Sequence, residues 1–295
     1  MSWANYDEVM DQLQSAGLEV QHLEIGTHKP VRCFEIKGDR EKRGWYWLSD
    51  ISIEGDLYIV GSYGIYRGND SGKMKVALGK KAKALTQEQR QAIAARHREN
   101  AKRAKAMRAA QAAKAGAKAA NAWRQYLPDG HSDYLDKKHC QAHGVRFAPS
   151  GNGTMAIPMC DTAGRVWGLQ IIRGKDRGKK LEKQYWPAGL NKRGKFHLIG
   201  SPVDILLIAE GYATAATLHE ETGRPVAVAY DAGNLLPVAQ AIRAAYKSTK
   251  ILICADDDYL TDGNPGCIAA EAAALAVNGA WCKNRCFHQI ETTKN

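Results

Sequence analysis

The residues best placed to do chemistry are carboxylates that follow short apolar runs. Glu210 ends the run DILLIAE and precedes Gly211, which lets the chain turn tightly into the next segment. A second run, KILICA, is followed by Asp256, Asp257 and Asp258. Because side chains alternate along an extended segment, we expect Asp256 and Asp258 to point to one side and Asp257 to the other. Glu210 and this pair of aspartates come together if the two runs are neighbouring parallel strands.

Such a group of carboxylates favours a divalent cation. No basic residue is nearby in the sequence, so the carboxylates would repel one another and their pKa values would rise. A cation removes that conflict, and a site made only of oxygen ligands suits Mg2+ or Mn2+. Such an ion serves phosphoryl or nucleotidyl transfer. The other interpretation is an acidic turn before the helix expected from Pro265, but the Glu-Gly pair in the same region favours the metal site.

The region that carries these acids, residues 201–290, alternates between apolar runs and helical segments. This pattern is typical of a mostly parallel sheet covered by helices on both faces. In such sheets, functional groups gather at the carboxyl ends of the strands. Asp231 ends the apolar run VAVAY, so we expect it at the same edge, with Gly233 and Asn234 in the segment that follows. We therefore predict an α/β domain here.

Three regions precede this domain. Residues 1–79 are predicted to form a small α+β unit, residues 80–126 an Ala-rich basic helix, and residues 127–200 a small α+β subdomain of short strands. The apolar positions of the helix are mostly alanine, so we expect it to bury little area, either as a solvated linker or as an arm that follows phosphates. Aromatic residues on strands are more often core and sheet-surface residues than platforms on which bases stack, so we expect the former for the first unit.

The net charge of +11 is concentrated in two segments. Residues 81–124 hold twelve Lys and Arg residues against two Glu, and residues 173–195 hold nine against one Asp and one Glu. The rest of the chain is therefore mildly acidic. This asymmetry indicates a polyanionic partner.

Composition also argues against several classes of protein. The apolar runs are far shorter than the roughly 20 residues that span a bilayer, and the N-terminus lacks an export signal, so we expect a cytoplasmic protein with no membrane partner. The seven cysteines are scattered, as in reduced cytosolic proteins. Two Cys/His clusters, within 139–143 and 282–288, lack a second pair at zinc-finger spacing, so we expect no zinc.

The segments LLIAEGYATAATL, AVAYDAGNLLPVA and ILICADDD resemble the TOPRIM domain, which is shared by bacterial primases, type IA and II topoisomerases and some nucleases. Among these, the chain is most similar to TOPRIM primases of phages, conjugative plasmids and integrative elements. The segments YLDKKHCQAHGVR, MAIPMCDTAGRVWGLQII and KRGKFHLIG resemble the region that precedes TOPRIM in them. The resemblance implies a Rossmann-like domain that makes short RNA primers on single-stranded DNA from ribonucleoside triphosphates, with a replicative helicase as a candidate partner in trans.

The resemblance also assigns roles to residues. It makes Glu210, Asp256 and Asp258 the catalytic acids and the ligands of Mg2+ or Mn2+. It places a second group near the nucleotide: Gly211, Asp231, Gly233 and Asn234. Basic residues would lie toward the template or the incoming triphosphate: Arg173, Lys175, Lys179, Lys180, Lys192, Arg193 and Lys195.

Two departures from that pattern leave alternatives open. Such primases usually have a zinc-binding module, and related chains often continue into a further acidic motif where the stretch AWCKNRCFHQIETTKN offers only Glu291. Metal binding is therefore a firmer expectation than polymerase turnover. The alternatives are a TOPRIM nuclease, in which the metal activates water, and a non-catalytic DNA-binding replication accessory protein with a truncated TOPRIM domain.

Overall fold

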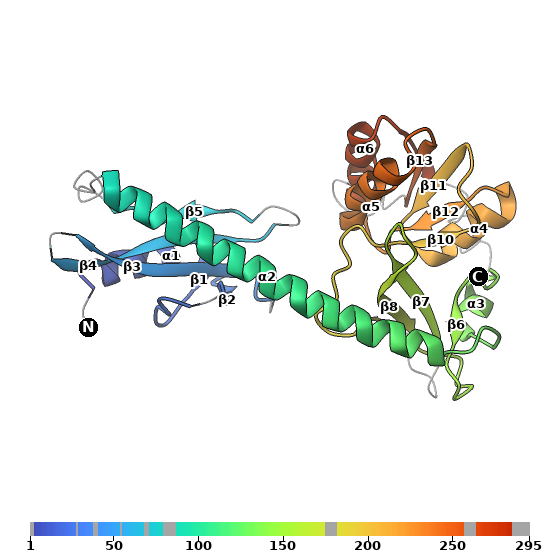
Figure 1. Ribbon diagram of the computed structural model, residues 1–295, viewed down its shortest axis with the longest axis horizontal. Helices are drawn as coiled ribbons and strands as arrows, with labels where there is room; N and C mark the ends of the chain where they lie inside the picture. Colours follow the sequence, from blue (N-terminus) through green and yellow to red (C-terminus); the bar gives the residue numbers. More distant parts are fainter. Residues whose placement is uncertain are drawn as a thin grey trace. The chain divides into compact units, whose positions relative to one another are not determined.

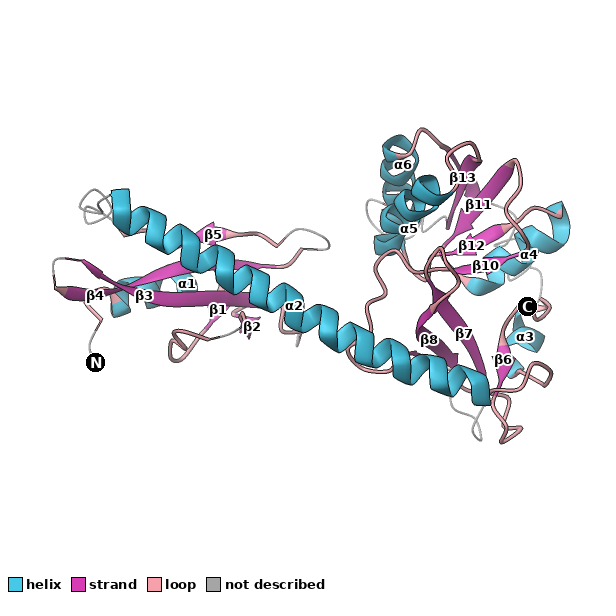
Figure 2. Ribbon diagram, viewed as in Figure 1, coloured by secondary structure: helices cyan, strands magenta, loops and turns pink. Residues whose placement is uncertain are grey.

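The computed structural model describes residues 3–27, 29–37, 41–53, 55–67, 71–78, 87–174, 182–256 and 264–284. The chain divides into two compact units, Met1–Met107 and Arg108–Asn295 (Figure 1). Both units combine helices with sheets, as the colouring by element shows (Figure 2). The predicted α/β class is therefore confirmed.

The first unit is a helix packed on an antiparallel sheet. The helix α1 (Tyr6–Ser15) is followed by β1 (Leu18–Glu19), β2 (Val31–Glu35), β3 (Gly44–Ile53), β4 (Asp56–Ile65) and β5 (Met74–Lys75), which pair in sequence order. Asn5 joins the start of the helix to the sheet through two hydrogen bonds with the backbone of Ile59, at 2.9 and 2.7 Å. Four of its aromatic residues are buried in the core, Trp45, Tyr46, Tyr58 and Tyr63, so packing explains these four.

The basic helix α2 (Gln87–Gln125) continues from the first unit into the second. In its C-terminal half, Ala112, Ala115 and Ala119 are at most 5% exposed. Gly116 lies against Trp167, where an added Cβ would make an ordinary contact with the ring at 3.4 Å. This half of the helix is therefore not a fully solvated linker, because its small side chains let it lie directly on a sheet.

That sheet is a four-stranded antiparallel meander of β6 (Arg146–Phe147), β7 (Met155–Cys160), β8 (Val166–Ile172) and β9 (Lys183–Trp186). Its two faces pack against different partners because side chains alternate along each strand. Ala156 and Leu169 pack with Ala119 of α2. Met155 and Ile157 face the opposite way, into a core shared with the short helix α3 (Asp133–Lys138) and with the C-terminal part of the chain.

The C-terminal part is a five-stranded sheet with helices on both faces. Its elements are β10 (His197–Ile199), β11 (Ile205–Ala209), α4 (Tyr212–Thr222), β12 (Val226–Val228), α5 (Ala232–Ala245), β13 (Lys250–Asp256), α6 (Pro265–Ala276) and β14 (Ala280–Asn284). The strand order is β10-β12-β11-β13-β14, and every pair is parallel except β10 with β12. β10 comes from the region 127–200 that we predicted to be separate, and it completes this sheet as an antiparallel edge strand.

Two buried layers cover the two faces of this sheet. Tyr212, Ala215 and Ala216 of α4 share one core with the four-stranded sheet. Helices α5 and α6 form the other core, through Val238, Ile242 and further apolar residues. Continuous apolar strands such as β11 are the expected result of burial on both faces.

Candidate active site

The carboxyl ends of β12, β11 and β13 lie side by side, as the sequence predicted. Ala209 pairs with Val228 on one side and with Cys254 on the other. Glu210 directly follows β11, Asp231 lies three residues after the end of β12, and Asp256 is the last residue of β13. All three therefore lie at one edge of the sheet, which we call the carboxyl edge. Asp257 and Asp258 lie outside the described residues, so the predicted contribution of Asp258 stays a prediction.

Glu210 and Asp256 are held differently at the carboxyl edge. The Oε1 atom of Glu210 is buried. Asp256 is partly exposed, and its Oδ1 accepts a hydrogen bond from the Thr214 hydroxyl at 3.5 Å. Thr214 stands in the first turn of α4, where unpaired backbone N–H groups and the helix dipole favour negative charge. The edge thus combines two carboxylates with the positive end of a helix.

Gly211 connects β11 to α4 and is the N-cap residue of this helix. Its backbone is extended, with φ −97° and ψ 152°, a conformation that any residue adopts. A Cβ at this position would meet only the Thr214 hydroxyl, at 3.7 Å. The tight turn expected here therefore does not require glycine, although glycine leaves the backbone of the carboxyl edge uncovered.

The backbone is strained beside Glu210. Tyr230 has a positive φ of 76°, which is unfavourable for a residue with a side chain. Three hydrogen bonds hold it: its N–H donates to the Glu210 carbonyl at 2.8 Å, its hydroxyl donates to the Pro158 carbonyl at 2.7 Å, and its carbonyl accepts from the Tyr185 hydroxyl at 3.3 Å. Strain fixed in this way is often found at functional sites.

A cationic group that sequence reasoning did not single out faces Asp256 from the four-stranded sheet. The Lys183 ammonium lies 5.2 Å from the ring centroid of buried Tyr134. Partial burial lowers the pKa of Lys183, nearby Lys138 lowers it further, and the negative charge of Asp256 opposes both. Burial raises the pKa of Tyr134 to about 12, although a hydrogen bond with the backbone of Ala213 in α4 opposes this rise. The alternation along β9 was the available sequence signal, because it turns Lys183 and Tyr185 to the same side.

Lys192 lies at the carboxyl edge, and its predicted contact with the template or the triphosphate stays a prediction. It forms an ion pair with Asp231, and its ammonium lies 4.6 Å from the ring centroid of Tyr185. Burial lowers the pKa of Lys192. The structure thus places one more cation at this edge, next to Tyr230.

Asn234 has a clear structural task. It is 2% exposed, and its Oδ1 accepts a hydrogen bond from the Gly194 N–H at 2.9 Å. Its Nδ2 donates to the carbonyls of Lys195 and Ala229, at 3.0 and 2.9 Å. The amide therefore ties the loop of Lys192 to the start of α5, while Gly233 beside it is exposed.

Other predicted residues lie elsewhere or outside the described residues. Arg173 donates to Gln184 on the opposite face of β9 from Lys183. Lys195 places its ammonium 5.1 Å from the ring centroid of Trp167, and Arg193 is exposed. The remaining predicted basic residues are not among those described: Lys175, Lys179 and Lys180.

A separate group of possible metal ligands, His131, Asp133 and Asp136, lies at the start of α3. It is largely exposed, and the ring nitrogens of His131 lie 3.1 and 3.5 Å from carboxylate oxygens of Asp133 and Asp136. Of the two Cys/His clusters, Cys140 is buried, whereas Cys286 and His288 lie outside the described residues. Burial raises the pKa of Cys140 to about 11, so its thiol stays protonated near neutral pH.

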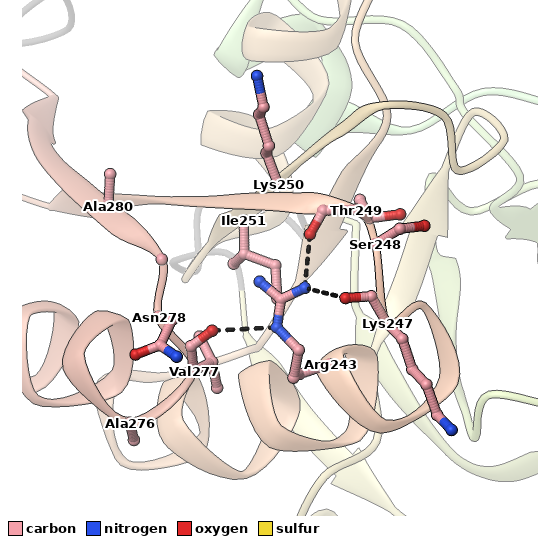
Figure 3. Close-up of a pocket in the computed structure, with 11 residues that line it drawn as sticks. Arg243, Lys247, Ser248, Thr249, Lys250, Ile251, Ala276, Val277, Asn278 and Ala280 are labelled. Carbon is pink, nitrogen blue, oxygen red and sulfur yellow. Dashed lines mark hydrogen bonds between the residues drawn. The ribbon is translucent and has the colours of Figure 1, made fainter.

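The opposite edge of the five-stranded sheet also has a cavity, shown in Figure 3. Arg243 of α5 lies in it and donates three hydrogen bonds to main-chain carbonyls, those of Val277, Lys247 and Thr249, at 3.0, 2.9 and 2.7 Å. These bonds join the end of α5 to the turn before β13 and the end of α6. The guanidinium of Arg243 therefore has a structural role.

Comparison with known proteins identifies the domain that contains the carboxyl edge. Residues 205–292 match the family model described as Toprim domain. These residues are a Toprim domain. The resemblance carried by LLIAEGYATAATL and ILICADDD is thereby confirmed, and the Toprim domain contains Glu210, Asp231 and Asp256.

Two curated relatives, both named DNA primase TraC and both from Escherichia coli, extend the match beyond the Toprim domain. They are 38% and 39% identical to this chain over 156 residues, or 50% of this chain. The match covers only 14% and 10% of the two relatives, so the chain spans a small part of their length.

Solved primase structures are similar at a lower level. The DnaG primase catalytic domain bound to ssDNA gives a TM-score of 0.38 with 16% identity over 58% of this chain and 70% of that chain. A DNA primase domain from Pseudomonas aeruginosa gives 0.33 with 14% identity, over 54% and 57% of the two chains. Similarity at this level defines no residue correspondence.

Among the described residues, no helix is both long enough and apolar enough to cross a membrane. The predicted cytoplasmic location stays a prediction.

Proposed function

We propose that the chain is a DNA primase-type nucleotidyltransferase that makes short RNA primers on single-stranded DNA. The observation that carries this proposal is the position of two acids, Glu210 and Asp256, at the carboxyl edge of a Toprim domain, with Lys183 of another sheet near Asp256. The similarity to two proteins named DNA primase TraC supports it. A transfer between nucleotides needs both kinds of group, acids to hold a metal and cations to hold phosphates.

The acids fit a hard divalent cation. Glu210 and Asp256 offer only carboxylate oxygens, and one oxygen of Glu210 is buried, as suits a ligand of fixed position. We assign them, with Asp258, to Mg2+ or Mn2+. When bound, such an ion neutralises phosphate charge and activates the attacking hydroxyl group.

The protein's own cations have separate tasks in this proposal. Lys183, whose ammonium lies over the Tyr134 ring and near Asp256, binds a phosphate oxygen of the incoming ribonucleoside triphosphate. Lys192, which pairs with Asp231 without substrate, exchanges this carboxylate for a second phosphate. Asn234 acts through the loop it fixes and keeps Lys192 in place. Exposed Arg193 and the basic residues around it are left for the template strand, whose backbone is a polyanion.

Primer synthesis from labelled ribonucleotides on single-stranded DNA with Mg2+ or Mn2+ tests this proposal. Glu210→Gln and Asp256→Asn should make no product, whereas Asp257→Asn is the matched control and should retain synthesis. The same reactions should be examined for strand cleavage. Cleavage without synthesis in the wild type would favour a Toprim nuclease instead. DNA binding without any product in all four proteins would leave only a non-catalytic role.

A further inference from the structure

A pocket opens on the face of the four-stranded sheet that packs against α2. It has a volume of about 660 Å³ and lies between the last turn of α2, the loop after β6, and strands β8 and β9. In Figure 2 the C-terminal half of α2 runs along this sheet. Its apolar wall includes Tyr126, Ile171 and Trp186. Pockets that bind small ligands typically have volumes of about 300–1,000 Å³.

Strand alternation separates this pocket from the carboxyl edge. In β9, Gln184 and Trp186 line the pocket. Lys183 and Tyr185, which alternate with them, face the Toprim domain. Because successive side chains of a strand point to opposite faces, the pocket is not part of the proposed active site.

The polar groups of the pocket are those that recognise a nucleotide. The side-chain amides of Gln125, Asn152 and Gln184 offer both donors and acceptors, which the edge of a nucleobase requires. Aromatic rings stack on bases of any sequence. The guanidinium of Arg173 can bind a phosphate through two hydrogen bonds.

Arg173 is oriented but still accessible. Its Nη2 donates to Oε1 of Gln184 at 3.2 Å. The pair between its Nε and Glu182 is long, at 3.9 Å, and both side chains are exposed. Burial raises the pKa of Tyr126, and the nearby positive charge of Arg173 opposes this effect, so the two groups lie close together.

We propose that this pocket binds one nucleotide unit, with the base against Tyr126 and Trp186 and the phosphate at Arg173. The approach to it is basic, because Lys118 of α2 lies 5.3 Å from the ring centroid of Trp186. A free nucleotide and a nucleotide within a single strand share this chemistry. The proposal does not depend on primer synthesis.

Fluorescence anisotropy of a labelled single-stranded DNA of about 12 nucleotides, measured in EDTA, tests the pocket without catalysis. Trp186→Leu and Arg173→Gln should each weaken binding about fivefold or more, and Trp186→Phe should bind like the wild type. The matched control is Arg124→Gln, which removes the same charge from α2 next to the pocket and should change binding less than about twofold. Because binding is measured in EDTA, without metal or ribonucleotides, a failure of the proposed catalysis leaves this test unaffected.

Two further probes identify the ligand. An otherwise identical strand without bases should bind the wild type and Trp186→Leu equally. Competition by a free nucleoside monophosphate would show that the pocket accepts a single nucleotide, and lack of competition would assign it to a nucleotide within a strand. Unchanged affinity of both pocket variants, with circular dichroism like that of the wild type, would overturn the proposal. Equal losses for Arg173→Gln and Arg124→Gln would overturn it as well.

Discussion

The two edges of the Toprim sheet both carry charge, but they use it in different ways. At the edge opposite the carboxyl edge, which we call the amino edge, Arg243 donates hydrogen bonds to three main-chain carbonyls. These bonds connect its guanidinium to the ends of α5 and α6 (Figure 3). At the carboxyl edge, Glu210 and Asp256 stand at the ends of adjacent strands, and Lys183 of a different sheet lies near Asp256. A charged side chain that donates hydrogen bonds to nearby main-chain carbonyls stabilises the fold. A group of like charges faced by cations from another element is arranged for a ligand.

This contrast leads to opposite expectations for stability and activity. The arrangement of the carboxyl edge costs stability, because like charges are brought together. The arrangement at the amino edge adds stability, because without Arg243 each of the three carbonyls would lose a hydrogen bond. Substitutions at the two edges therefore separate the two properties.

The largest effect is expected from Asp256→Asn. Because the amide cannot replace the charge of the carboxylate as a metal ligand, primer synthesis should fall at least about a hundredfold. The free energy of unfolding should change by less than about 1 kcal/mol, since a repulsive charge is removed. Chemical denaturation beside the synthesis assay measures both. A variant that is strongly destabilised would place Asp256 with the structural charges.

Arg243→Met should show the reverse. Losing three hydrogen bonds from a charged donor to the main chain should lower the free energy of unfolding by about 3 kcal/mol. The control is Arg224→Met, which removes an exposed ion pair with Asp204 and should cost less than about 1 kcal/mol. Metal binding per folded molecule should remain, as measured by calorimetry at a temperature where the variant is folded. Loss of metal binding there would mean that the two edges are coupled.

Much of the fold follows from sequence patterns. Apolar runs such as Ile205–Ala209 alternate with helical segments, and this pattern alone indicates parallel strands whose carboxyl ends meet. The position of Glu210, Asp231 and Asp256 at one edge follows directly. These residues could be predicted because local burial and connection rules place them.

The rest depends on tertiary contacts that no local pattern encodes. In the sequence, Gly116 and the alanines around it are typical of a weakly hydrophobic, solvent-exposed helix. Only their packing beside Trp167 shows that this part of α2 lies on a sheet. Asn234 was predicted to lie near the nucleotide, and no local pattern indicates that its amide also binds the Gly194 loop. The sequence did not distinguish Lys183 from the basic residues around it, because only the tertiary structure places it near Asp256 from a separate sheet.

A smaller effect, about 2 kcal/mol, is expected from the pH dependence of His197. This residue is buried at the start of β10, beside the carboxyl end of β12, and its Nε2 lies 2.6 Å from the carbonyl of His143. Burial lowers its pKa from 6.5 to about 4. Because the folded pKa is the lower one, the stability is present above pH 6.5 and is lost as pH falls toward 4.

Denaturation at pH 7 and pH 5 measures this loss. His197→Gln keeps a donor for the His143 carbonyl but does not titrate, so it should lose about 2 kcal/mol less than the wild type between these pH values. An equal loss in both proteins would assign the acid sensitivity to other groups, such as the carboxylates of the edge.

The most moderate effect is expected from Lys183→Gln. If the carboxyl edge is arranged for a ligand, this cation contributes one charge-assisted hydrogen bond to the triphosphate, and its loss should raise the KM for ribonucleoside triphosphates about tenfold. The control, Lys137→Gln, removes an exposed charge from the neighbouring helix α3 and should leave KM within about twofold. Unfolding free energy should change little, because the Lys183 side chain is accessible to solvent. A stability loss without a change in KM would make Lys183 a structural charge like Arg243, and the contrast between the two edges would then rest on the acids alone.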